Sequence, residues 1–86
     1  MNSQEIWEAV LAEIKLNLSK ANFLTWFKDT TLLEVKDEVA IISVPSNFVK
    51  EWLEKKYHKT ILNLLNKLSP EIKNVQYVIS SSKKPL

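Results

Sequence analysis

The 86-residue sequence contains no glycine, no cysteine and no arginine. Phosphate-binding loops of the GxxxxGK[ST] and GxGxxG types, and the GxSxG turn that carries a nucleophilic serine, all need glycine. Without cysteine the chain forms no disulfide framework and no thiolate metal site, a composition that fits the cytoplasm. The single histidine, His58, has no neighbour that suggests a catalytic triad. We therefore predict no enzymatic activity, no cofactor and no metal.

The charge of the chain is carried by lysines and acidic residues, with a net charge of +2. The commonest base-specific contacts to DNA are made by arginine, so its absence disfavours sequence-specific DNA binding, although lysine can contact phosphates. Glutamates at positions 5, 8 and 13 argue against a signal peptide. No apolar run approaches the roughly 20 residues needed to cross a membrane. The length suffices for one domain.

Two consecutive helices are expected at the start of the chain. Glu5 follows Asn2 at the spacing of a capping box, so the first helix should begin here and run to about Leu18. Its apolar face has helical spacing and comprises Trp7, Val10, Leu11, Ile14 and Leu18. Ser19 should cap a short second helix, ANFLTWFK. Three aromatic residues within five positions predict that most of this second helix lies in the core.

The pattern changes to strands after the second helix. TTLLEV and VAIISV predict a hairpin with strands at about 30–35 and 39–44, and Asp37 is the best candidate for a left-handed turn residue. Pro45 ends the second strand, and Ser46 caps a long helix from about 47 to 68. VQYVI, at 75–79, is expected to form a third strand.

The predicted order of elements is α-α-β-β-α-β. It indicates an α+β domain over residues 1–79, with the helices packed on one three-stranded sheet. Residues 80–86 form a polar tail, which we interpret as the start of a linker.

Three segments of the chain resemble the N-terminal domain of the bacterial replication initiator DnaA. They are Trp7 with Leu11, then LSKANFLTWF, then VPSNFVKEWLEKKY, which is similar to the Pro-Asn-x-Phe signature of that family with Ser46 in place of its usual asparagine. The resemblance covers residues 5–79 and implies a KH-like fold. KH domains clamp nucleic acid with a GxxG loop, which a chain without glycine cannot form.

The resemblance implies a protein–protein interaction domain in replication initiation. It would mediate self-oligomerisation, recruit the replicative helicase and bind regulators of initiation, and no contact with a membrane is implied. Self-association would use Trp7 at an exposed start of the first helix, together with Ile6, Val10 and Leu11. Helicase or regulator docking would use residues of the second and third helices, namely Asn22, Thr25, Trp26, Ser46, Asn47 and Phe48.

Plainer interpretations of these residues stay open. By its spacing alone, Trp7 belongs to the core face of the first helix. Phe48 lies off the main apolar stripe of the long helix, so it is either an exposed anchor for a partner or a residue at the edge of the core. Trp26 could serve the core only, and Asn22 could be an ordinary solvated residue.

An alternative function is that of a stand-alone KH-like domain that binds single-stranded nucleic acid. Lys55, Lys56 and Lys59 would make weak phosphate contacts on one face of the long helix. A solvated helix face explains the same lysines, and the expected burial of Tyr57 removes a base-stacking ring. We expect weak nucleic-acid binding or none.

Overall fold

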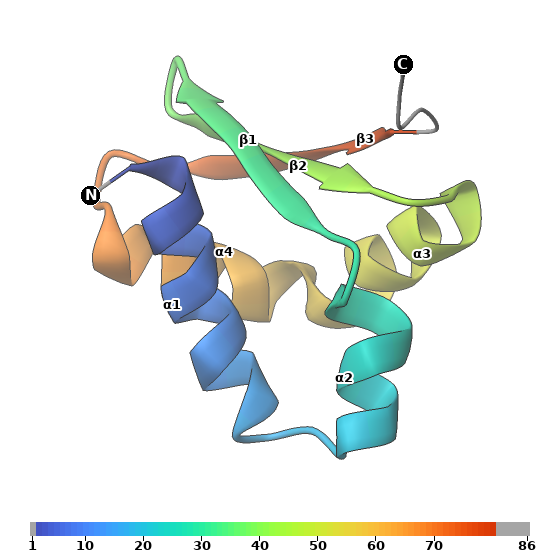
Figure 1. The fold of residues 1–86 in the computed structure, drawn as a ribbon. Helices are drawn as coiled ribbons and strands as arrows, with labels where there is room; N and C mark the ends of the chain where they lie inside the picture. The colour runs from blue at the N-terminus through green and yellow to red at the C-terminus, as the bar shows by residue number, and fades with distance from the viewer. Residues whose placement is uncertain (1, 81–86) are drawn as a thin grey trace.

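The computed structural model describes residues 2–80 and has the predicted element order (Figure 1). Helices α1 (Ser3–Lys15) and α2 (Lys20–Phe27) precede strands β1 (Thr31–Lys36) and β2 (Val39–Val44). A long helix follows, composed of α3 (Asn47–Trp52), a π-helical turn η1 (Leu53–Tyr57) and α4 (His58–Leu68). β3 (Asn74–Ile79) is the last element among the described residues. The predicted α+β class is confirmed. Residues 81–86 of the predicted tail lie outside the described residues.

Side-chain caps set the start of α1, α2 and α3. Asn2 Oδ1 accepts a hydrogen bond from the backbone N–H of Glu5 at 2.8 Å, and Glu5 Oε1 accepts one from the Asn2 N–H at 3.0 Å. This is the predicted capping box. Ser19 Oγ accepts from the Asn22 N–H at 3.1 Å, and Ser46 Oγ from the Val49 N–H at 3.3 Å. The end of α1 was predicted less well, because the helix stops at Lys15 rather than near Leu18.

The sheet has the order β1-β2-β3, with β1 and β2 antiparallel and β2 and β3 parallel. Both residues of the β1–β2 turn are left-handed, with φ of 52° at Asp37 and 69° at Glu38. The prediction for Asp37 is confirmed, and Glu38 shares the role because a two-residue hairpin turn of this kind needs positive φ at both positions. The helices lie on one side of the sheet (Figure 1).

The core joins α1 to the sheet through Trp7, which is only 3% exposed. Its indole Nε1–H donates to both the carbonyl oxygen and the hydroxyl oxygen of Thr30, each at 3.2 Å. The expectation of an exposed Trp7 is therefore wrong, because the ring turns toward the sheet and its polar atom is satisfied at the entrance to β1. Ile6 and Val10 are buried as well, and only Leu11 of the four predicted self-association residues is partly exposed.

The long helix contains an irregularity that its sequence pattern does not reveal. Leu53–Tyr57 form a π-helical turn, and Tyr57 has φ −120° and ψ 2°. A π turn adds one residue to the helix and rotates every later side chain relative to the regular register. Leu53 is fully buried, and the half-buried Tyr57 ring meets Phe27 edge-on, with ring centroids 5.3 Å apart.

The burial of Trp7 predicts its effect on stability. Trp7→Ala should lower the free energy of unfolding by about 3–5 kcal/mol, because it opens a cavity and leaves Thr30 without its donor. The matched control Glu8→Ala changes the exposed neighbouring residue and should stay within about 0.5 kcal/mol of the parent chain. Urea denaturation of the three proteins measures the difference. A Trp7→Ala protein as stable as the control would contradict this packing.

Tyr77 gives the domain a predicted dependence on alkaline pH. Burial disfavours the phenolate, and the nearby Glu54 charge adds to this, so the pKa of Tyr77 is raised above its ordinary value of 10.0. His58 Nδ1 lies 3.3 Å from the Tyr77 hydroxyl oxygen. Because the folded-state pKa is the higher one, this contribution to stability is complete below pH 10 and is lost as the pH rises further.

The measurement is the free energy of unfolding across this alkaline range for the parent chain and for Tyr77→Phe. The parent should lose stability more steeply above about pH 10 than the variant, which has no phenol to ionise. Equal slopes for the two proteins would show that the tyrosine has an unperturbed pKa.

Candidate protein-docking site

Three aromatic rings from two helices form a continuous patch on the surface. Trp26 of α2 stacks on Trp52 of α3, with ring centroids 4.4 Å apart and an interplanar angle of 14°. Phe48 lies one helical turn before Trp52. Its ring packs against Trp26, with ring centroids 5.3 Å apart and an interplanar angle of 43°. We call Trp26, Phe48 and Trp52 the aromatic patch.

The three rings differ in their exposure. Trp26 and Trp52 are half-buried and pack against the core, whereas Phe48 is 70% exposed. A phenyl ring held against other aromatic rings but mostly open to water is typical of a residue that anchors a binding partner. Of the two interpretations of Phe48, this exposure favours the exposed anchor over a residue at the edge of the core.

The sequence around Phe48 holds it in the first turn of α3. Pro45 follows β2 directly, and Ser46 caps the helix through the Val49 N–H. The side-chain amide of Asn47 donates to Glu51 Oε2 at 3.0 Å across one helical turn. Ser46 and Asn47, predicted as docking residues, thus have a structural role here: they fix the backbone that carries Phe48.

The remaining predicted docking residues lie on α2. Asn22 and Thr25 are exposed, and their helical spacing places them on the same side of α2 as Trp26. The Thr25 hydroxyl donates to the Ala21 carbonyl at 2.8 Å. The structure brings Trp26 and Phe48 into contact, as expected. Asn22 and Thr25 are exposed polar residues on the same helix as Trp26.

Trp52 belongs to the patch, although its spacing from Val49 and Leu53 is also typical of the core stripe of the long helix. Its indole Nε1 is buried and has no hydrogen-bond partner among residues 2–80. The signal that points to its role is the i, i+4 spacing from Phe48, which puts both rings on one helix face. Because the stripe also includes Trp52 at core spacing, sequence alone does not separate the two roles.

The basic residues of the long helix lie beside the patch. Lys55, Lys56 and Lys59 are exposed, and Lys56 Nζ lies over the Trp52 ring, 5.7 Å from its centroid. Lys55 and Glu51 line a shallow groove of about 170 Å³ together with Phe48 and Trp52. Charges of both signs therefore border the patch, and the surface is not a uniformly basic stripe.

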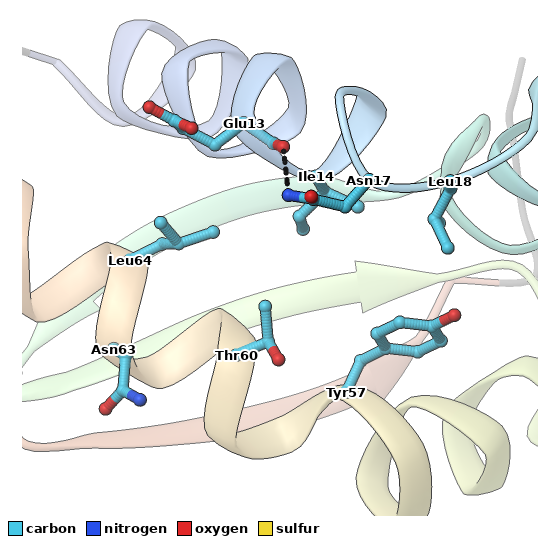
Figure 2. Close-up of a pocket in the computed structure, with 8 residues that line it drawn as sticks. All are labelled: Glu13, Ile14, Asn17, Leu18, Tyr57, Thr60, Asn63 and Leu64. Carbon is cyan, nitrogen blue, oxygen red and sulfur yellow. Dashed lines mark hydrogen bonds between the residues drawn. The ribbon is translucent and has the colours of Figure 1, made fainter.

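A second, larger groove of about 380 Å³ lies between the end of α1 and the long helix (Figure 2). Ile14, Leu18, Tyr57 and Leu64 supply its apolar wall. Its polar lining comprises Glu13, Asn17, Thr60 and Asn63. The Asn17 amide donates to the Glu13 carbonyl at 3.3 Å, the bond drawn in Figure 2. None of the predicted docking residues lines this groove.

Residues 2–80 hold no cluster of three or more His, Asp or Glu side chains suited to a metal ion. Over the same range, none of the helices has the length and apolar character of a membrane span.

Comparison with known families identifies the domain. The model of the DnaA N-terminal domain family matches residues 4–67 of the 86. The chain belongs to the DnaA N-terminal domain family. This membership places the chain in the initiation of DNA replication, and the domains of the family are protein-interaction domains. The matched range contains the whole aromatic patch and ends before β3.

The difference in exposure between the rings predicts different effects on stability. Phe48→Ala should cost less than about 1 kcal/mol of unfolding free energy, because most of the ring is already in water. Trp26→Ala removes a half-buried ring that contacts two others and should cost about 3 kcal/mol. Chemical denaturation of both variants measures this. A loss of 3 kcal/mol or more in Phe48→Ala would make that residue part of the core.

Proposed function

We propose that this domain recruits proteins to the site of replication initiation through the aromatic patch, and that the replicative helicase and regulators of initiation are its partners. The observation that carries the proposal is the exposed Phe48 ring on the Trp26–Trp52 stack. The family membership supports the role in replication initiation. This role implies a cytoplasmic location and requires neither catalysis nor a cofactor.

The geometry favours strong binding through a small surface. Burying the exposed part of Phe48 against a partner should contribute about 1.5–3 kcal/mol, or roughly ten- to a hundredfold in affinity. The capped helix start fixes the position of the ring before binding, which lowers the entropy lost on association. Asn22 and Thr25 would form the polar rim that surrounds the apolar centre of such interfaces.

Self-association is the second part of the proposal. Fewer apolar residues of α1 are exposed than the sequence suggested, so fewer can contact a second copy. Ile6, Trp7 and Val10 are buried, so they would support an interface from beneath rather than contact a second copy directly. A groove of about 340 Å³ beside Trp7 and Leu11 is one feature of α1 that could receive a second copy. An interface of this size would be weak.

Single-stranded nucleic acid is the competing ligand for the same region. Lys55, Lys56 and Lys59 are available for phosphate contacts. Phe48 is the ring in this region that is mostly open to a base. Trp52 stacks on Trp26 with Lys56 over its ring, and Tyr57 meets Phe27, so these rings offer less stacking surface. Binding through phosphates weakens steeply with added salt, whereas docking on an apolar patch changes little.

The test is the affinity of the 86-residue chain for the replicative helicase of the same organism, measured by calorimetry at low and high salt. Phe48→Ala should weaken binding at least tenfold without lowering the melting temperature appreciably. Leu33→Ala is the matched control, because Leu33 is 52% exposed but lies on β1, away from the patch.

Two results would contradict docking at the aromatic patch. One is a Phe48→Ala chain that is stable and binds the helicase normally. The other is an equal loss of affinity in Leu33→Ala, which would mean that exposed apolar side chains act without a defined site. Binding to single-stranded DNA that disappears at high salt and depends on Lys55, Lys56 and Lys59 would favour the nucleic-acid alternative.

A further inference from the structure

The two edges of the sheet differ in how they are protected from pairing with another strand. The β1 edge is interrupted by a bulge between Leu32 and Glu34, and it carries charges at Glu34 and Lys36. Bulges and charges are the usual devices that keep edge strands apart. β3, with the sequence NVQYVI, contains no charge and no proline, and its six pairings with β2 are in regular register.

The hydrogen bonds of β3 show which of its backbone groups face outward. The Ser80 N–H donates to the Val44 carbonyl at 2.9 Å, and the Asn74 N–H to the Glu38 carbonyl at 3.2 Å. In a parallel ladder, alternate residues direct both backbone groups to the same neighbour, so the even-numbered residues of β3 face β2. Val75, Tyr77 and Ile79 therefore direct their N–H and C=O groups away from β2, on the side where β3 has no neighbouring strand among residues 2–80.

One of these outward donors is already occupied. The Val75 N–H donates to Oδ1 of its neighbour Asn74 at 2.9 Å. Asn74 thus shields the beginning of the edge. The outward groups of Tyr77 and Ile79 form the part of β3 that is open to a further strand.

We propose that β3 pairs antiparallel with β3 of a second copy of this chain, about a two-fold axis at Tyr77, to form a continuous six-stranded sheet. This register sets Tyr77 opposite its own copy and Val75 opposite Ile79, and so matches all the outward-facing residues of one strand with those of the other. The inference rests on the proposed self-association and assigns it to β3 instead of α1.

The chemistry of the strand fits a second copy as the occupant. An antiparallel pair of uncharged strands brings no like charges together, and a two-fold axis uses the same surface on both copies. On the face that bears the helices, Val75 would cover Ile79, which is 45% exposed in the single chain. On the open face, Gln76 would lie opposite Val78, and Asn74 opposite Ser80.

The register also determines the shape of the pair. In this register, odd-numbered residues lie opposite odd-numbered residues and even-numbered opposite even-numbered. The two side chains of each pair therefore point to the same face of the sheet. The helices of both copies would therefore lie on one side of the joined sheet, and the aromatic patches of both would remain free. An edge of six residues buries less area than stable dimers do, so the pair should be weak and dependent on concentration.

Sedimentation equilibrium of two variants of the 86-residue chain tests this pairing, because one substitution should weaken dimerisation and the other should strengthen it. Ile79→Pro removes an N–H that faces away from β2, so the hydrogen bonds between β2 and β3 should be kept while dimerisation weakens at least tenfold. The control Ile79→Val should dimerise normally. Asn74→Ala releases the Val75 N–H for the second copy and should strengthen dimerisation severalfold.

Cross-linking tests the register, and the natural absence of cysteine makes it specific. Gln76 and Val78 would form a pair without backbone hydrogen bonds, with Cα atoms about 4.5 Å apart, which is within disulfide range. An equimolar mixture of Gln76→Cys and Val78→Cys chains should form a mixed disulfide dimer faster than either chain alone. Glu8→Cys, on the exposed side of α1, is the control and should cross-link slowly.

Two results would overturn the proposal, and they are distinguishable. A chain that stays monomeric at millimolar concentration would contradict both the proposed self-association and its assignment to β3. A dimer that survives Ile79→Pro but is lost in Leu11→Ser, or that cross-links through Glu8→Cys, would keep self-association and place it on α1.

Discussion

The stack of Trp26 on Trp52 is the contact on which the proposed function depends. It joins α2 to α3, two helices separated in the sequence by the whole β1–β2 hairpin. α2 has only eight residues and a single fully buried side chain, Phe27, so its orientation relies on contacts of this kind. With the two tryptophans in place, Phe48 lies on a surface of aromatic rings one helical turn away, and the patch exists before any partner arrives.

The aromatic residues Trp7 and Phe48 differ in burial and therefore in what they contribute to folding. Trp7 is buried, and its N–H is satisfied by Thr30, so it fastens α1 to the sheet. Phe48 contributes little to folding because most of its ring is in water. Under the proposed function, this difference would let the exposed ring bind a partner without a cost in stability. The burial of Trp7 also leaves α1 with less apolar surface for an interface.

Much of the fold follows from local rules in the sequence. The caps at Asn2, Ser19 and Ser46 and the left-handed turn at Asp37 were predictable, because each depends on a side chain within a few residues of its target. The α-α-β-β-α-β order follows from those boundaries and from the change of apolar periodicity.

The features that were not predictable depend on packing between distant segments. Periodicity placed Trp7 on the core face, and the expectation of exposure came from the family resemblance; only the position of Thr30 decides the matter. The π turn at Leu53–Tyr57 has no signature in the sequence, and it ends at Tyr57, whose ring meets Phe27 from a distant helix. Trp52 joins the patch because α2 lies against it, a contact that no local pattern encodes.

The most direct test of the central claim uses the three tryptophan indole N–H signals in a ¹⁵N NMR spectrum, one each for Trp7, Trp26 and Trp52. During titration with the replicative helicase, the signals of Trp26 and Trp52 should shift or broaden, together with the backbone amides around Phe48. The Trp7 signal should stay unchanged, because its N–H is bonded to Thr30 in the core. Perturbation of Trp7 and α1, with the other two indoles unaffected, would contradict docking at the aromatic patch.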